Sequence, residues 1–254
     1  MSESNTWAKP IALSAMHHRH LALGAVMVER DGWQRPARYA SAERELDQLR
    51  EAVGLCDISP VGKLSLQGDD LDSALARAFG DARPPDVGAV QMRSVSSGAA
   101  QLHVALARLA HDEAMVFTDP GHAAAVSETL EQAADLCAHV VDVTSGLGGV
   151  RITGPSAHLL LAGVTELDAS PDALPNMSCA QTKIAEVHAV LLRLDVGSVC
   201  SSYEVYFGRE FGEYMWDALL EAGDEHGAVP VGMEAMEELA SSVHRGGRRD
   251  RKDG

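Results

Sequence analysis

The most informative feature of the sequence is a pattern of apolar and polar positions that occurs twice in the same order. In 62–67 and again in 149–153, apolar and polar residues alternate as they do in a strand. A glycine and a stretch typical of a helix start follow each run. Each run also comes shortly after an Asp, an apolar residue and a Ser or Thr, at 57–59 and 142–144. The chain is therefore predicted to contain an internal repeat.

The similarity between the two halves continues downstream. The segment 85–91 is echoed by 175–181, and each half then has two strand-like runs and a closing helix. The predicted strands are 100–109, 113–118, 184–194 and 202–207, and the predicted closing helices are 120–136 and 209–222. This order predicts an α+β protein in which two pseudo-repeated, ferredoxin-like halves surround a central cavity. The predicted divisions are an N-terminal segment 1–20, halves 21–140 and 141–243, and a basic, disordered tail 244–254.

Composition narrows the classes of function. The chain has 254 residues, 46% of them hydrophobic, which is enough for a full core. A formal net charge of −16 argues against a nucleic-acid partner, because phosphate neutralisation needs a basic surface. The four cysteines include no CxxC pair, the N-terminus lacks a signal-peptide pattern, and no apolar run approaches a membrane span. These features predict a cytoplasmic protein without a membrane partner.

The ordered set of motifs resembles the folate-binding aminomethyltransferase superfamily. The stretches 20–39 and 43–59, with the strand and turn at 62–68, resemble glycine-cleavage T-proteins. The stretches 152–155, 179–185 and 190–193 are more similar to sarcosine oxidase gamma subunits, and 211–223 with 230–232 matches both branches. The resemblance covers residues 13–240, and its specificity lies in the order of the motifs rather than in any one of them.

The resemblance implies a fold whose centre holds tetrahydrofolate, which accepts a one-carbon unit from an aminomethyl donor. Such chemistry needs an acid near the reacting nitrogen and a second carboxylate that binds the amino-pyrimidine edge of the pterin. A basic residue should meet the glutamate tail. The family also has a third, barrel-like domain, which this chain is expected to lack.

Several of the implied site positions carry other residues in this chain. The strand that should supply the acid has no carboxylate, and His103 stands there; Met92 takes the place of an aromatic residue before that strand. Cys200 lies in the segment that should supply the pterin-binding Glu, and only the later Glu204 keeps the family's residue. A C-terminal Arg-Leu-Glu pattern falls on 240–242, which reads Ala-Ser-Ser. The cofactor-binding candidates are therefore Met92, His103, Cys200 and Glu204, with no catalytic residue and no metal ligand predicted.

Each candidate also has a structural interpretation. His103 can be a packed or solvated strand residue rather than a general acid or base, and Cys200 has no evident base beside it. Glu204 can be a salt-bridged strand residue. The histidines at 17, 18 and 20 could hold a metal, although no partner cluster is evident. The glycines at 146–149 precede a strand rather than a helix, so they are interpreted as a turn and not as a phosphate loop.

Two classes of function follow, and the sequence leaves open whether the chain is an enzyme. The first is a non-catalytic subunit, similar to sarcosine oxidase gamma, of a flavin-dependent demethylating complex. The second is a folate-dependent aminomethyltransferase with altered active-site residues; a folate-sensing or repair protein is a weaker third alternative. Binding of tetrahydrofolate is expected to be weak or absent. The expected partner is a larger flavoprotein subunit or a second copy, docked on Met233, Met236 and Leu239 and extended by Trp216, unless that segment closes the core.

Overall fold

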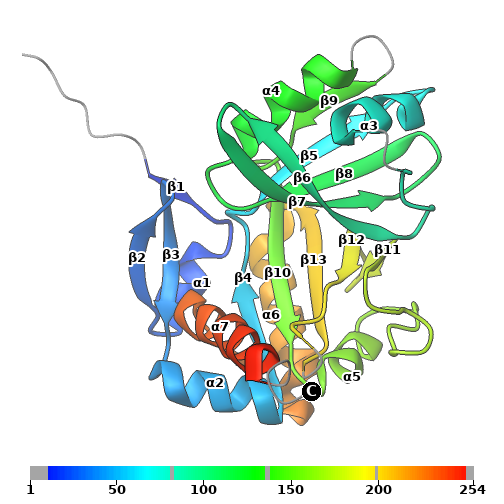
Figure 1. Cartoon of the computed structure of the whole chain (residues 1–254). Coiled ribbons are helices and arrows are strands. Elements are labelled where there is room, and N and C mark those ends of the chain that lie inside the picture. The colour runs from blue at the N-terminus through cyan, green and yellow to red at the C-terminus, as the bar shows by residue number, and fades with distance from the viewer. Residues whose placement is uncertain (1–10, 81–82, 135–137, 198–199, 250–254) are drawn as a thin grey trace, which may run out of the picture.

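Three β-sheets and seven α-helices make up the described part of the chain, which in this computed structural model comprises residues 11–80, 83–134, 138–197 and 200–249 (Figure 1). The strands are β1 Ala12–Leu13, β2 Val26–Arg30, β3 Trp33–Arg38, β4 Val53–Asp57, β5 Gly62–Gln67, β6 Val90–Ser97, β7 Ala100–Arg108, β8 Glu113–Thr118, β9 His139–Asp142, β10 Leu147–Thr153, β11 Ser178–Ile184, β12 Val187–Arg193, β13 Ser202–Gly208 and β14 Ala228–Pro230. The helices are α1 His17–Ala22, α2 Ala42–Glu51, α3 Leu71–Phe79, α4 Ala123–Ala134, α5 Ala157–Ala162, α6 Gly212–Gly223 and α7 Met233–Arg249, with 3₁₀ turns η1 Arg209–Phe211 and η2 Asp224–His226. The α+β class is confirmed, and the strands and closing helices predicted by alternation lie within a few residues of these bounds.

The two large sheets share one strand order. The first runs β6-β7-β8-β5-β9, and the second runs β11-β12-β13-β10-β4 with β14 added at its edge. The last strands are exchanged between the halves, because β4 from the first half joins the second sheet and β9 returns to the first. The predicted division at residue 140 falls inside β9, and β4 from before that division lies in the second sheet, so the division does not coincide with the boundary between the sheets. Superposition of the two halves stays a prediction.

The repeated Asp–apolar–Ser/Thr segments are the crossovers between the sheets. The Asp57 carboxylate accepts the Ser59 N–H at 2.8 Å, and the Asp142 carboxylate accepts the Thr144 N–H at 2.8 Å. Each hydroxyl then binds a strand of the sheet that the chain is leaving: Ser59, after β4, accepts from the Gly149 N–H of β10 at 3.3 Å, and Thr144, after β9, accepts from the Lys63 N–H of β5 at 3.0 Å. In both crossovers the Asp caps the turn, and the hydroxyl fixes the turn to the sheet that the chain is leaving.

The echoed segments at 85–91 and 175–181 lie against each other. Val90 N–H donates to Met177 O and Cys179 N–H donates to Gly88 O, both at 2.8 Å, around an antiparallel bridge between Ala89 and Ser178. The edges of the two large sheets are therefore joined at one corner.

Stacked aromatic rings lie between the sheets, where the sequence analysis expects a cavity. The rings of Phe117 on β8 and Tyr206 on β13 stack with centroids 4.4 Å apart, within a cluster of apolar side chains from both sheets. Gly148 and Gly149, interpreted above as part of a turn, are instead residues of β10 opposite Phe207 and Tyr206. A Cβ at Gly149 would lie 3.0 Å from the Tyr206 ring, so the glycine makes room for it.

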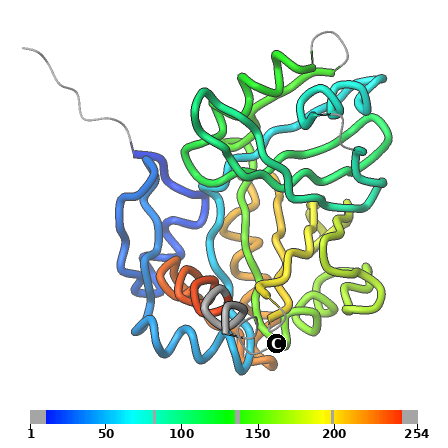
Figure 2. Tube along the Cα trace, in the orientation of Figure 1, coloured from blue at the N-terminus to red at the C-terminus, as the bar shows by residue number. Residues whose placement is uncertain are grey.

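The helix α7 closes a fourth hydrophobic cluster rather than exposing a docking surface. Met233, Met236 and Leu239 are buried, and the last two pack with α2 and the start of β13. The chain's C-terminal helix thus lies along α2 and the N-terminal sheet β1-β3-β2 (Figure 2). Trp216 is also fully buried. The predicted docking surface on these residues is wrong, because all four side chains are buried: Met236 and Leu239 in the cluster under α7, and Trp216 in the core of the second sheet.

The boundary of the predicted tail is also wrong. Helix α7 runs to Arg249, so 244–249 are helical, and 250–254 lie outside the described residues. No helix in the described ranges is long and apolar enough to cross a membrane.

Gly154 provides a direct test of how closely β4 and β10 pack. Its φ of +141° disfavours any side chain, and an added Cβ would lie 2.3 Å from the Ala52 carbonyl oxygen. Gly154→Ala is expected to lower the free energy of unfolding by about 1–3 kcal/mol, measured by urea denaturation. Gly98→Ala, also at positive φ but with open space around the new Cβ, should cost only about 1 kcal/mol. Equal losses in the two variants would contradict the close approach.

Candidate functional site

The candidate site lies on the faces that the two large sheets turn toward each other. Across the first sheet, Met92, Ala105, Phe117 and Lys63 occupy one row of directly paired positions. Tyr206 of the second sheet meets this row by stacking on Phe117, and the Lys63 ammonium lies 5.8 Å from the Tyr206 ring centroid.

Glu204 is the centre of a buried polar cluster beside this stack. Its carboxylate is 3% exposed; Oε1 accepts from Arg151 Nε at 3.0 Å and also from Nη2, while Oε2 accepts from the Tyr206 hydroxyl at 2.6 Å. Arg151 stands directly opposite Glu204 on the neighbouring strand. Burial and the nearby Glu204 carboxylate raise the pKa of the Tyr206 hydroxyl well above its usual value, so it stays a donor. Both carboxylate oxygens are thus engaged by this chain's own groups.

Lys63 is fully buried at the same place, a position that sequence reasoning missed. Its ammonium donates to the carbonyl oxygens of Ser59 at 2.7 Å and Val61 at 2.8 Å. Burial lowers the pKa of this ammonium to about 8, and the carboxylates of Asp57, Asp142 and Glu204 offset only part of that effect. In the sequence, Lys63 lies on the strand face opposite Leu64 and Leu66, so alternation alone does not mark it as buried.

The titration of Lys63 is a second testable expectation. The folded chain should release the Lys63 proton near pH 8, whereas the unfolded chain holds it to about 10.5. Between these values the unfolded state binds more protons, so this group's contribution to the free energy of unfolding rises with pH. NMR of isotope-labelled lysine side chains should show one resonance titrating near pH 8 that is missing in Lys63→Met. A Lys63 resonance titrating near 10.5 would contradict the burial.

Met92 and His103 lie on the face that turns toward the second sheet, but at its exposed end. Met92 is 58% exposed, and His103 Nδ1 forms a 3.1 Å hydrogen bond with Ser94 Oγ at the paired position of β6. Leu102 points to the other side of β7 and packs against the cluster under α3 and α4. At the position where an acid is expected, the side chain that faces the second sheet is therefore the His103 imidazole.

Cys200 does not belong to the site. It is buried among side chains of α2 and α7, where its thiol lies 3.7 Å from the Leu49 carbonyl oxygen. Burial raises the pKa of the Cys200 thiol, which disfavours a nucleophilic thiolate. The structure thus brings Met92, His103 and Glu204 to the inter-sheet region and places Cys200 in the core.

A groove of about 480 Å³ opens beside Tyr206 on the second sheet. This volume suits a small organic ligand. The polar side chains along it are those of Gln181, Thr182, Lys183 and His188, together with the Tyr206 ring, and its described lining includes no carboxylate. Tetrahydrofolate presents paired N–H donors on its pterin edge, which a carboxylate satisfies best. The residues present therefore do not fit this cofactor.

A second polar network, also missed by sequence reasoning, holds the N-terminal segment. His20 Nε2 and Asp57 Oδ2 are 2.9 Å apart, and the Tyr39 hydroxyl lies 2.7 Å from His20 Nδ1. His20 is fully buried, with its ring edge-on to Trp216 at 4.8 Å. His20 thus serves in packing, and within the described ranges no group of three His, Cys, Asp or Glu is placed to hold a metal ion.

Comparisons with known proteins agree with this architecture. Residues 16–242 match the family profile of the GCVT N-terminal domain. The alpha subunit of sarcosine oxidase from Rhizobium meliloti is 28% identical over 250 residues, which cover 91% of this chain and 25% of that subunit. An aminomethyltransferase from Saccharopolyspora erythraea is 28% identical over 228 residues, which cover 88% of this chain and 61% of that protein. The chain thus spans only part of the length of these relatives.

Two solved structures share the fold. The glycine cleavage system aminomethyltransferase T from Bartonella henselae superposes with a TM-score of 0.78 at 21% identity, over 91% of this chain and 62% of that one. One chain of the heterotetrameric sarcosine oxidase from Corynebacterium sp. U-96 gives a TM-score of 0.61 at 23% identity, over 85% of this chain and 96% of that one.

Proposed function

Because the chain belongs to the GCVT N-terminal domain family, we propose that it is a non-catalytic subunit of a flavin-dependent demethylating complex similar to sarcosine oxidase. The relatives support this class, since they include a sarcosine oxidase alpha subunit and a chain of a heterotetrameric sarcosine oxidase. In such a complex this subunit would contribute packing surface while the partner supplies the flavin chemistry.

The observation that carries the proposal is the state of the carboxylates. Glu204, which keeps the family's residue, has both oxygens engaged by Arg151 and Tyr206. The inter-sheet face of β7 presents His103 where an acid is expected. A pterin bound here would have to displace Arg151 or leave its own donors unpaired, at about 1–3 kcal/mol for each orphaned group.

The second candidate is a folate-dependent aminomethyltransferase with altered site residues. It is favoured by the similarity to part of the aminomethyltransferases and by the N-terminal segment that resembles T-proteins. In that case Glu204 would have to leave Arg151 when folate binds, and the groove beside Tyr206 would receive the ligand.

A calorimetric titration with tetrahydrofolate separates the two candidates. Weak or absent binding is expected, with a dissociation constant well above the micromolar range. No aminomethyl transfer by the purified chain is expected either, and His103→Asp should not create it, because the remaining carboxylate stays paired. A micromolar constant that Glu204→Ala abolishes, or activity in His103→Asp, would favour the transferase.

A further inference from the structure

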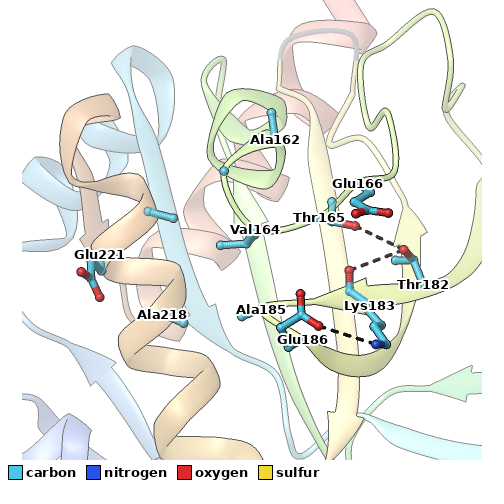
Figure 3. A pocket seen from close by; sticks show the side chains of 12 residues that line it. Ala162, Val164, Thr165, Glu166, Thr182, Lys183, Ala185, Glu186, Ala218 and Glu221 are labelled. Carbon is cyan, nitrogen blue, oxygen red and sulfur yellow. Dashed lines mark hydrogen bonds and ion pairs between the residues drawn. The ribbon is translucent and has the colours of Figure 1, made fainter.

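A groove of about 720 Å³ follows α6 on the helix-covered side of the second sheet (Figure 3). It runs between the end of α5, the β11–β12 turn and the outer face of α6. Its floor consists of small side chains, among them Val164, Ala185, Ala218 and Ala222. Val164 and Ala185 pack onto the core beneath. This groove shares Thr182 and Lys183 with the groove beside Tyr206, so the two grooves meet along β11.

The turn that forms one wall is held in a fixed conformation. Ala185 and Glu186 both have positive φ, 45° and 64°. Ala185 N–H donates to Val164 O at 2.7 Å, and the Tyr214 hydroxyl donates to Ala185 O at 3.0 Å. These bonds attach the turn to both α6 and the segment after α5, so the groove exists before any partner arrives.

The rim of the groove carries unbalanced negative charge. Glu166, Glu186 and Glu221 stand around it with a single cation, Lys183, which already forms an ion pair with Glu186 at 3.6 Å. Among the residues that the structure describes, neither Glu166 nor Glu221 has an ion-pair partner. A partner with basic side chains would supply the missing charge.

Exposed apolar side chains extend the surface beyond the groove. Tyr214 in α6 is 53% exposed, Phe211 in η1 is 41% exposed, and Leu159 on α5 is 45% exposed. The apolar face of a helix packs well against such a surface, in which large apolar residues lie beside a groove with a floor of small side chains.

We propose that this groove docks a basic amphipathic helix from a partner protein. The apolar face of the helix would lie on the floor formed by Val164, Ala218 and Ala222, and its Lys or Arg side chains would pair with Glu166 and Glu221. The inference goes beyond the proposed function, because it holds for a complex subunit and for a transferase alike.

The test uses the full chain and a synthetic Leu/Lys peptide of about 14 residues with apolar positions at i, i+3, i+4 and i+7. Titration followed by amide NMR at about 0.15 M salt should perturb 162–166, 182–186 and 218–222. A scrambled peptide of the same composition is expected to bind about tenfold more weakly. Equal binding of the two peptides, or shifts spread over the whole acidic surface, would overturn the proposal.

Two sets of variants distinguish the effect of the groove's shape on peptide binding from the effect of its charge. Ala218→Phe fills the floor without changing the charge and should weaken binding about tenfold. Glu166→Gln with Glu221→Gln should weaken binding more than the control pair Glu43→Gln and Glu128→Gln, which are exposed on other helices. Thermal unfolding verifies that each variant is folded. Unchanged affinity in folded Ala218→Phe, or equal effects of both glutamate pairs, would overturn the proposal.

Discussion

Replacement of Glu45 by alanine is expected to lower the free energy of unfolding by about 3–5 kcal/mol. The Glu45 carboxylate is buried at the start of α2 and accepts three backbone N–H groups: those of Tyr39 at 2.6 Å, Ala40 at 2.7 Å and Gly232 at 2.8 Å. The first two belong to the connection between β3 and α2, and the third belongs to the connection between β14 and α7. One side chain therefore joins the N-terminal sheet, α2 and the C-terminal helix.

The size of the effect follows from the three backbone N–H groups that the substitution leaves without an acceptor in a buried place. Each unpaired group costs about 1–3 kcal/mol. Urea denaturation of the purified variant measures it. The matched control is Glu43→Ala, an exposed residue in the first turn of the same helix, which should cost only about 0.3–1 kcal/mol. A loss below about 1 kcal/mol in Glu45→Ala would show that these N–H groups find other partners.

The second large effect is expected at His20. His20→Leu removes the partner of a buried carboxylate and should cost about 3–5 kcal/mol. Asp57 would keep its Ser59 N–H bond but lose its side-chain hydrogen bond to His20, and the Tyr39 hydroxyl would lose its bond to the imidazole. His18→Leu, an exposed neighbour on α1, is the matched control and should change stability little.

The pH dependence of this effect has a defined sign. Burial alone would raise the pKa of the Asp57 carboxyl, but the hydrogen bond and charge of His20, together with hydrogen bonds from Ser14 and Ser59, outweigh burial and lower the pKa below the usual 3.8. The stability from this pair is therefore fully present above the usual carboxyl pKa and is lost as the pH falls through the lowered value. The difference between wild type and His20→Leu should shrink in acid. In the His20→Leu background, Asp57→Asn should recover part of the lost stability, because it removes the Asp57 charge that has lost its partner. A further loss of stability in the double variant would contradict this explanation.

Much of the secondary structure follows from local pattern. Alternation in 62–67 and 149–153 places β5 and β10, and apolar spacing places α6, because these periods reflect which face of an element is buried. The exchange of β4 and β9 between the sheets could not be predicted, since periodicity does not say which strand lies next to which. The doubled Asp–apolar–Ser/Thr segments were visible in the sequence, but their role as crossovers depends on hydrogen bonds to the other half.

The candidate site was harder to predict because its residues act through contacts distant in the sequence. The loss of a carboxylate at His103 was readable from the strand. Engagement of Glu204 by Arg151 and Tyr206 depends on strand register, and so does the burial of Lys63. Cys200 could not be assigned to the core without α7, whose Met236 and Leu239 cover it. The glycines of β10 looked like a turn because the aromatic rings that need their space lie 57 and 59 residues later, at Tyr206 and Phe207.

Our central proposal is that this chain acts as a folate-independent subunit of a flavin-containing complex. Purification of the untagged chain from its native source, followed by native mass spectrometry and absorbance spectroscopy, tests it most directly. The account predicts co-purification with a larger subunit and a flavin spectrum in the same fraction. A free monomer that lacks flavin and binds tetrahydrofolate with micromolar affinity would contradict it.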